Sequence, residues 1–146
     1  RSGFVAGDPD LLKSYLLYRT YHGSAMSPVV QSASIAAWKD EDHVRENRRL
    51  YALKYAAVLP LLSDVLPASM PEGGFYLWAR TPIDDTVFAR ELFRTYNVTV
   101  LPGSYLARES GGINPGRNRV RIALVADIKE CIESAGRIAE FVRSKL

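Results

Sequence analysis

One arginine, Arg121, lies inside an otherwise apolar run, NRVRIALV (residues 118–125), whose residue types are typical of a β-strand. A guanidinium is permanently charged, and taking it out of water is costly unless an anion meets it. Its planar fork of donors matches a carboxylate, which it binds through two parallel hydrogen bonds. The run therefore predicts either a strand with one wet face or a site for a planar anion.

Strand alternation divides this run into two faces. Val120, Ile122 and Leu124 point one way, and the face that carries Arg119 and Arg121 is mixed. On this pattern alone we favour an exposed edge strand that holds both arginines in water. A carboxylate site beside Arg121 is the alternative.

The other side chains that could carry chemistry do not form a recognisable active site. His22 and His43 lack partners at metal-ligand spacing, and Cys131 lies on the apolar row of a helix. We interpret all three as structural or surface residues and expect no metal site. Asp84 and Asp85 sit at a helix start, where the helix dipole explains them. No nucleophile is arranged with a base.

The composition is that of an ordinary globular chain. Its 146 residues are 47% hydrophobic and 24% charged, with a formal net charge of +3 and one cysteine. The cations are interspersed with carboxylates along helices, which is typical of a solvated surface and argues against nucleic-acid binding. No apolar run reaches the ~20 residues that span a bilayer, so we expect no membrane partner. The lone cysteine fits a reducing compartment, and we expect a cytoplasmic location.

The first half of the chain predicts one strand and three helices. Residues 2–8 have the pattern of a short strand. Two helices are predicted to start at Asp8 and Ser27, each of which is followed by proline. A long helix begins near Asp40. The long helix has two apolar rows, so we expect it to be covered on more than one side, with Pro60 as a kink or break. A lone strand is marginal, and we interpret this segment as the end of another domain that begins upstream.

The second half predicts a strand–helix–strand–strand–helix unit, an α+β layer with its own core. The expected strands are 75–80, 98–101 and 118–125. The expected helices are 84–97 and the stretch capped by Asp127. A glycine-rich loop is expected at 107–117. The apolar face of the first helix consists of Phe88, Leu92, Phe93 and Tyr96, and that of the second runs from Ile128 to Val142.

Five segments in this order resemble the C-terminal portion of the class I/II aminotransferases, the fold-type I pyridoxal-phosphate enzymes. They are RSGFVAGD, SPVVQSASIAAW, PEGGFYLWA, VTVLPGSYL and NRVRIALV. The resemblance implies an α/β fold, the C-terminal part of a PLP-dependent transferase fold. Residues 1–38 would end the large PLP-binding domain, residues 39–66 would form an inter-domain helix, and residues 67–146 would form the small α+β domain.

The resemblance also assigns site residues. It implies that Arg121 clamps the substrate α-carboxylate and that Arg1 contacts the phosphate of the cofactor, pyridoxal 5′-phosphate. The lysine that forms the Schiff base would lie before Arg1, so no catalytic residue is assigned to this chain, and we expect the isolated chain to be inactive. The missing N-terminal part of the enzyme and a second copy, in a homodimer, are the expected partners.

The loop sequence SYLARESGGINPGRNRVR is similar to the N-succinyldiaminopimelate aminotransferases of bacterial lysine biosynthesis. This similarity implies N-succinyl-L,L-diaminopimelate and 2-oxoglutarate as the amino acid and the 2-oxo acid. We hypothesise that Arg108 helps recognise the succinyl or distal carboxylate, and a solvated loop arginine is the alternative. For the whole chain, the second interpretation is a non-catalytic binding or assembly module with an aminotransferase-like small domain.

Overall fold

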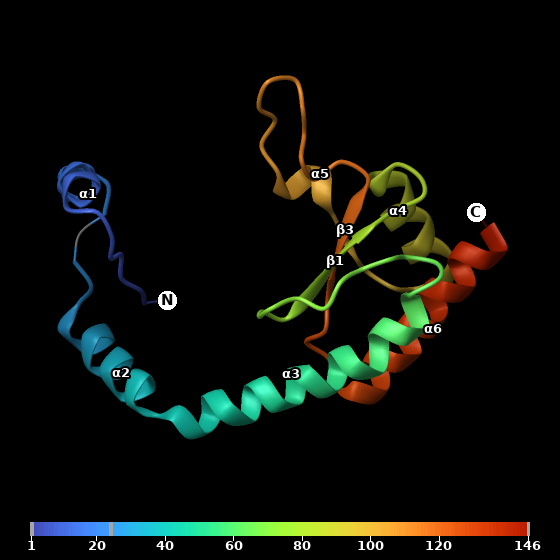
Figure 1. The fold of residues 1–146 in the computed structure, drawn as a ribbon, viewed down its shortest axis with the longest axis horizontal. Helices are drawn as coiled ribbons and strands as arrows, with labels where there is room; N and C mark the ends of the chain where they lie inside the picture. Colours follow the sequence, from blue (N-terminus) through green and yellow to red (C-terminus); the bar gives the residue numbers. More distant parts are fainter. Residues whose placement is uncertain (1, 24, 146) are drawn as a thin grey trace. The chain divides into compact units, whose positions relative to one another are not determined.

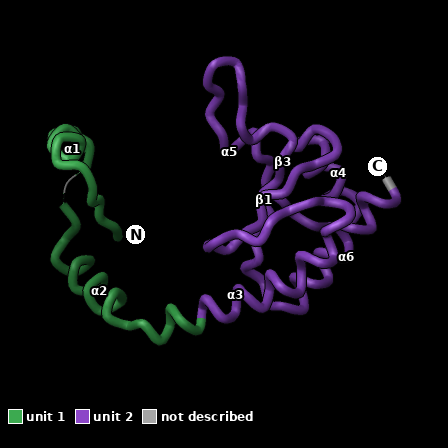
Figure 2. Tube along the Cα trace, in the orientation of Figure 1, with its two compact units in different colours: residues 1–46 green, residues 47–146 purple. Residues whose placement is uncertain are grey.

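The computed structural model describes residues 2–23 and 25–145. The chain divides into two compact units, unit 1 at residues 1–46 and unit 2 at residues 47–146 (Figure 2). No helix within the described ranges is both long and apolar enough to cross a bilayer.

Unit 1 contains two helices that the sequence starts with local caps. α1 (Pro9–Tyr21) begins after Asp8, whose carboxylate accepts hydrogen bonds from two N–H groups of the first turn, at 2.9 and 3.1 Å. α2 (Pro28–Lys39) begins after Ser27, whose hydroxyl accepts the N–H of Val30 at 3.4 Å. Proline occupies the first position of both helices, where its missing N–H has no intrahelical partner to lose. Both predicted helices are confirmed.

The strand predicted at residues 2–8 does not form in the described part of this segment. A strand needs a neighbour for its N–H and C=O groups, and the described residues of unit 1 include no other strand. Ser2 instead reaches α2, where its hydroxyl lies 2.6 Å from the hydroxyl of Ser34, and Phe4 packs against Trp38 with ring centroids 5.5 Å apart. The prediction was wrong because an apolar run between glycines was taken as a strand without a partner.

The predicted long helix is confirmed as α3 (Glu41–Leu62) (Figure 1). It continues through Pro60 for two further residues, so the proline lies in its last turn and does not end it. A proline this close to the end disturbs few intrahelical hydrogen bonds. The apolar row that is buried consists of Tyr55, Val58 and Leu62, and the row that stays exposed includes Leu50, Leu53 and Leu61.

Unit 2 is organised around a three-stranded antiparallel sheet in the order β1-β3-β2. β1 (Tyr76–Arg80) pairs with the whole of β3 (Arg119–Ala123), and β2 (Leu101–Pro102) pairs with the other side of β3. β3 is therefore the central strand, and the exposed edge strand that its pattern favoured was wrong. Of the strand predicted at 98–101, only Leu101 lies in β2, which extends to Pro102.

Two amphipathic helices of unit 2 were predicted, and both are confirmed. α4 (Asp85–Tyr96) buries part of its predicted apolar face, but Phe93 is 56% exposed. α6 (Ile128–Lys145) begins after its predicted cap, Asp127. Among the described side chains of α6, the buried ones are Cys131, Ala135, Ile138, Ala139 and Phe141, whereas Ile128 and Ile132 of the predicted row are exposed.

The core of unit 2 lies between one face of the sheet and the helices α3, α4 and α6 (Figure 1). The alternation predicted for β3 is confirmed, because Val120 and Ile122 are buried in this core. Phe88 of α4 and Phe141 of α6 pack edge to face, with ring centroids 5.2 Å apart. This packing fixes the sheet from one side and leaves its other face for a site.

The chain leaves the sheet after β2 and returns to it at β3. It first forms a short helix that was not predicted, α5 (Gly103–Leu106), and then the predicted loop at 107–117 (Figure 1). The loop turns back where Ser110 and Ile113 exchange two backbone hydrogen bonds, at 3.0 and 3.1 Å. The two glycines between them have positive φ angles of 58° and 76°, which glycine adopts without strain. Residues 103–118 together are called the excursion loop.

Candidate functional site

β3 presents Arg121 on the face of the sheet that is turned away from the core. Its neighbours Val120 and Ile122 point into the core. In the register of the sheet, Arg121 lies between Trp78 of β1 and Leu101 of β2. Pairing on both sides holds the backbone of Arg121, so its side chain starts from a rigid position.

A hollow of about 560 Å³ opens beside Arg121. Its lining residues are Ser69, Pro71, Gly73, Tyr76, Trp78, Leu106 and Arg121. They come from the segment before β1, from β1 itself, from α5 and from β3. Among the described residues of this lining only Arg121 is charged, which favours an anion in the hollow.

The guanidinium of Arg121 lacks a hydrogen-bond partner within the described residues. Its Nε is buried and donates no hydrogen bond there, and no described carboxylate forms an ion pair with the side chain. Its Cζ lies 5.7 Å from the centroid of the Tyr76 ring, within the range of a cation–π contact. A buried donor without an acceptor costs about 1–3 kcal/mol. The arrangement therefore favours a planar anion such as a carboxylate, which fills the fork of donors.

Arg108 lies on the excursion loop, two residues after Leu106, which lines the hollow. Its side chain is exposed and has no hydrogen bond or ion pair with another described residue. Two residues of chain span at most about 7 Å, so Arg108 stands near the rim of the hollow and not within its lining.

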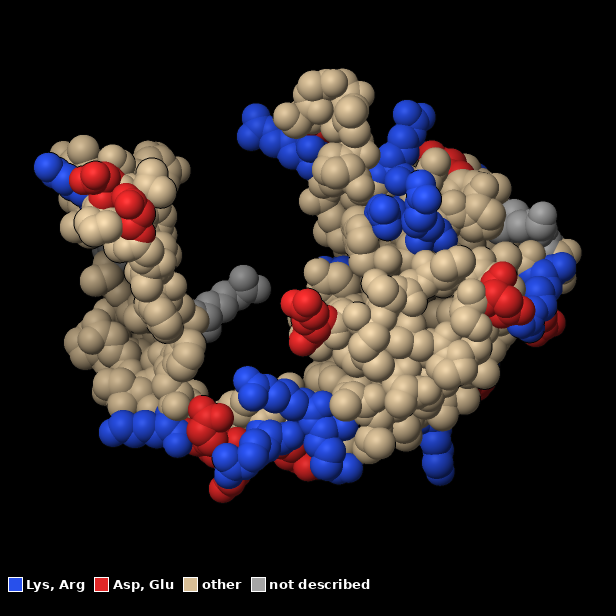
Figure 3. Space-filling model, in the orientation of Figure 1, with Lys and Arg blue, Asp and Glu red and all other residues tan. Residues whose placement is uncertain are grey.

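Other basic side chains gather on the same face of the sheet. Arg80 of β1 and Arg119 of β3 are opposite each other in the register. Figure 3 shows a group of Lys and Arg side chains over the region where Figure 1 labels β3 and α4. Like charges in opposed positions destabilise a sheet slightly, and neither arginine lines the hollow. Arg80 and Arg119 therefore raise the positive potential on the face of the sheet that carries Arg121 without lining the hollow.

The described lining of the hollow includes neither of the two histidines singled out in the sequence. Arg1 lies outside the described residues. His43 pairs with Asp40, with 3.0 Å between Nδ1 and Oδ2, and His22 stacks on Tyr18 with ring centroids 4.4 Å apart. Both contacts are those of structural or surface histidines.

Neither Cys131 nor any described lysine is part of the lining of the hollow. Burial raises the pKa of the Cys131 thiol, which makes it an inert core residue. The described residues include no group of His, Cys, Asp and Glu side chains arranged to hold a metal ion. Lys54 of α3 donates to the carbonyl of Leu124 at 2.9 Å and lies 5.0 Å from the centroid of the Tyr51 ring. No described lysine lines the hollow.

The sequence interpretation missed Asp85. The helix dipole was taken to explain Asp84 and Asp85 together, but only Asp84 caps α4, through two backbone N–H groups of the first turn. Asp85 is fully buried and accepts hydrogen bonds from Ser104 and Asn118 of the excursion loop. The signal in the sequence was a second acid beyond the one that capping requires.

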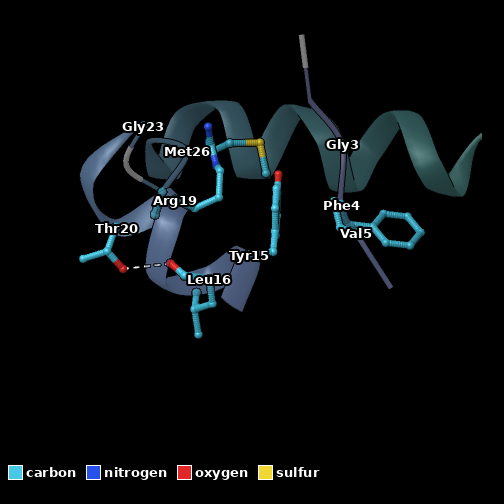
Figure 4. Close-up of a pocket in the computed structure, with 10 residues that line it drawn as sticks. Gly3, Phe4, Val5, Tyr15, Leu16, Arg19, Thr20, Gly23 and Met26 are labelled. Atoms are coloured by element: carbon cyan, nitrogen blue, oxygen red, sulfur yellow. Dashed lines mark hydrogen bonds between the residues drawn. The ribbon is translucent and has the colours of Figure 1, made fainter. Parts of the chain in front are cut away.

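Unit 1 carries a wider hollow of about 720 Å³ (Figure 4). Its lining includes Phe4, Tyr15 and Met26, which are exposed side chains. The charged residue of this lining, Arg19, donates to the carbonyl of His22 at 2.8 Å. The hollow is therefore an uncovered apolar surface and not a converging set of polar groups.

Known proteins resemble the chain along almost its whole length, although no family model matches it. The LL-diaminopimelate aminotransferase of Nitratidesulfovibrio vulgaris is 31% identical over 144 residues, which cover 96% of this chain and 36% of that protein. The crystal structure of an aminotransferase from Neisseria meningitidis matches with a TM-score of 0.82 and 54% identity, covering 98% of this chain and 37% of that one.

A third likeness concerns a probable N-succinyldiaminopimelate aminotransferase from Thermus thermophilus. Its structure matches with a TM-score of 0.59 and 33% identity, over 70% of this chain and 26% of that one. The chain spans about a third of the length of the curated relatives it matches, 32% and 36% for two of them.

Proposed function

We propose that the full-length protein moves an amino group between an amino acid and a 2-oxo acid, because the chain belongs to the fold-type I aminotransferases. Its fold is that of their C-terminal portion, as the sequence resemblance implied. The part that we assign to the described residues is to hold the substrate.

The observation that carries this proposal is the buried Nε of Arg121, which has no partner among the described residues and lies in a hollow whose described lining carries no other charge. An amino acid and the 2-oxo acid formed from it share one carboxylate. A single guanidinium therefore serves both substrates through two parallel hydrogen bonds. Arg121 holds each substrate by the group that the reaction leaves unchanged, so the reacting carbon stays free to meet the rest of the active site.

Pyridoxal 5′-phosphate is the cofactor that we propose for the full-length protein. When bound, it supplies the electron sink for amino-group transfer. The described residues do not by themselves form a site for it, since no described lysine lines the hollow. Arg1, the proposed phosphate contact, lies outside the described residues. Because the hollow offers no described lysine for a Schiff base, we expect the 146-residue chain alone to show no transaminase activity.

N-Succinyl-L,L-diaminopimelate and 2-oxoglutarate are the substrates that we propose, which assigns the reaction to lysine biosynthesis. Two of the similar proteins are named for diaminopimelate or its N-succinyl derivative. Within this chain the support is Arg108, an exposed cation near the rim of a hollow that already holds one arginine. A succinylated substrate carries a further carboxylate far from the one at Arg121, and Arg108 is the residue that we propose for it.

The test of the carboxylate clamp compares Arg121→Lys with Arg119→Lys in the full-length protein. Lysine keeps the charge but loses the planar fork. We expect Arg121→Lys to lower kcat/KM for the amino acid and for the 2-oxo acid. The loss should correspond to about 2–4 kcal/mol of transition-state stabilisation, with little change in cofactor affinity. Arg119 lies on the same face of β3 but outside the hollow, so its variant should retain activity. A collapse of cofactor affinity with intact substrate kinetics would refute the assignment.

The test of Arg108 uses the Arg108→Ala variant with succinylated and plain dicarboxylic substrates. We expect kcat/KM to fall on the order of tenfold for the succinylated substrate, as for one lost hydrogen bond to a charged group, and less for the plain one. Arg117→Ala removes a second exposed loop arginine and is the matched control. Equal losses on both substrates would show that Arg108 is a solvated loop residue.

A second copy, in a homodimer, and the rest of the same polypeptide are the partners that we propose for unit 1. α1 and α2 bury none of their described residues, and Phe4 and Trp38 are 76% and 62% exposed. Apolar surface of this kind marks a contact surface.

We also propose a cytoplasmic location for the protein. This proposal rests on the single cysteine, which fits a reducing compartment.

A further inference from the structure

We infer that Asp85 is a positioning residue, whose carboxylate ties together the two ends of the excursion loop and thereby fixes Leu106 and Arg121 at the hollow. The carboxylate with its partners Ser104 and Asn118 is called the Asp85 latch. The latch is independent of the reaction that the protein catalyses, and only its kinetic consequence rests on the proposed function.

Both oxygens of the Asp85 carboxylate are used. Oδ2 accepts the N–H of Ser104 at 2.9 Å and its hydroxyl at 2.6 Å, and Oδ1 accepts the N–H of Asn118 at 3.0 Å. The residue is fully buried, with 0% of its surface exposed. Burial acts to raise the pKa of Asp85, but the hydrogen bonds from Ser104 and Asn118 outweigh it and hold the pKa below its ordinary value. A buried charge requires such partners.

The two ends of the excursion loop meet at this carboxylate. Ser104 lies in α5, and Asn118 directly precedes β3. The backbones of Gly103 and Gly116 approach so closely that a Cβ on Gly103 would lie 2.3 Å from the carbonyl oxygen of Gly116. The carbonyl of Asn118 also accepts the N–H of Thr81 at 2.9 Å. The Asp85 latch thus joins two ends of the excursion loop that already lie close together.

Asn114 adds two uncharged hydrogen bonds between the same two ends of the excursion loop. Its side-chain NH₂ donates to the carbonyl of Ser104 at 3.1 Å, and its Oδ1 accepts the N–H of Gly116 at 2.9 Å. These bonds do not involve Asp85. Loss of the aspartate should therefore loosen the ends of the loop without unfolding unit 2.

Two lining residues of the hollow depend on the positions of these ends. Leu106 follows Ser104 by two residues in the same short helix, and Arg121 follows Asn118 by three residues in β3. Both residues line the hollow. A shift at either end moves the residue that follows it, and a misplacement of about 1 Å can cost on the order of a hundredfold in rate.

Helix capping does not account for Asp85. The neighbouring Asp84 already caps α4 and accepts the N–H groups of Thr86 and Val87, at 3.0 and 3.2 Å. The two aspartates are adjacent, yet one is exposed and the other is buried. This contrast makes Asp84 the matched control for Asp85.

The test compares Asp85→Asn with Asp84→Asn in the full-length protein, and its first readout is hydrogen exchange in the excursion loop. Asparagine offers one acceptor oxygen and turns an NH₂ group toward a donor, so at least one latch bond is lost. We expect exchange in residues 103–118 to become about tenfold faster or more in Asp85→Asn. Asparagine caps a helix as well as aspartate does, so Asp84→Asn should leave this exchange unchanged.

The second readout is the division of the effect between KM and kcat. Because the latch positions Arg121, Asp85→Asn should raise KM for the amino acid and the 2-oxo acid on the order of tenfold. A purely structural defect lowers the folded fraction, and hence kcat, at unchanged KM. Ser104→Ala removes the hydroxyl donor and keeps the carboxylate. It should give the same changes at smaller size, and it carries the test if Asp85→Asn does not fold.

The outcomes distinguish the latch itself, its role in positioning Arg121 and the proposed function. Equal exchange in residues 103–118 for Asp85→Asn and Asp84→Asn would overturn the latch. Faster exchange at unchanged KM would overturn its role in positioning Arg121. If the full-length protein shows no transaminase activity while the excursion loop opens as expected, the proposed function fails and the latch stands.

Discussion

Units 1 and 2 both contain helices with side-chain caps, yet they differ in what those helices bury. α1 and α2 bury none of their described residues, whereas Phe88 of α4 and Phe141 of α6 are 0% and 1% exposed. Caps and proline positions are local and set a helix without help. Burial needs a second surface, and in this chain only unit 2 supplies one from its own described residues.

The two hollows repeat this difference. The hollow of unit 1 is lined by exposed residues of α1 and of the segments before and after it, and α1 buries none of its residues. The hollow of unit 2 contains Arg121, whose strand is paired on both sides and packed on a core. A side chain can be held for recognition only where the backbone beneath it is held, so the candidate site belongs to unit 2.

Hydrogen exchange of the 146-residue chain should show the largest contrast between the units. We expect the amides of β1 and β3 to exchange at least about 10⁴-fold more slowly than those of residues 3–7, because the sheet opens only when unit 2 unfolds. Equal protection in a proven monomer would show that unit 1 has a core of its own.

Two matched aromatic truncations sharpen the same contrast. Phe141→Ala removes a fully buried ring from unit 2 and should lower the free energy of unfolding by about 3–5 kcal/mol. Trp38→Ala removes a ring that is 62% exposed in unit 1, and its effect should stay within about 0.5 kcal/mol. Urea unfolding of the 146-residue chain measures both. A large loss for Trp38→Ala would contradict the account of unit 1.

Acid should affect the two units through different carboxylates. The pKa of Asp85 is lowered in the folded chain, so its stabilisation is complete above the unfolded value of about 3.9 and is lost as the pH falls through the lower folded value. We expect Asp85→Asn to remove on the order of 1 kcal/mol of the difference in unfolding free energy between neutral pH and acid.

The matched acid in unit 1 is Asp40. Its pKa is also lowered, through the hydrogen bond with His43, but both side chains are exposed. Asp40→Asn should leave the acid dependence unchanged within error because solvent and salt screen this pair. An equal effect of the two substitutions would remove the distinction between them.

The helix caps give the smallest expected effects. Asp8→Ala should cost α1 about 1 kcal/mol, and because α1 buries nothing, this loss should melt a measurable part of the helix. Asp127 caps α6 in the same way, at 2.9 Å to the N–H of Glu130, but α6 is held by the core. Circular dichroism of Asp8→Ala and Asp127→Ala should show loss of helix only in the first. Equal loss would mean that packing does not support α6.

The sequence predicted the features that depend on neighbouring residues. The caps at Asp8 and Asp127 and the alternation of β3 that turns Arg121 away from the core needed no knowledge of other segments. The same local information failed at residues 2–8, because a strand exists only with a partner.

Features that depend on distant segments escaped prediction. The central place of β3 results from pairing with β1 and β2, which are remote in the chain. The role of Asp85 results from contacts with Ser104 and Asn118, 19 and 33 residues away. Nothing near Asp85 in the sequence identifies those partners, and the helix dipole offered a sufficient local explanation.

A crystal structure of the full-length protein with 2-oxoglutarate would show whether Arg121 binds the substrate carboxylate. We expect both oxygens of one ligand carboxylate to lie about 2.7–2.9 Å from two nitrogens of the Arg121 guanidinium, Nε among them. A bound and ordered ligand whose carboxylates contact other residues, with the Nε of Arg121 still without an acceptor, would refute this role.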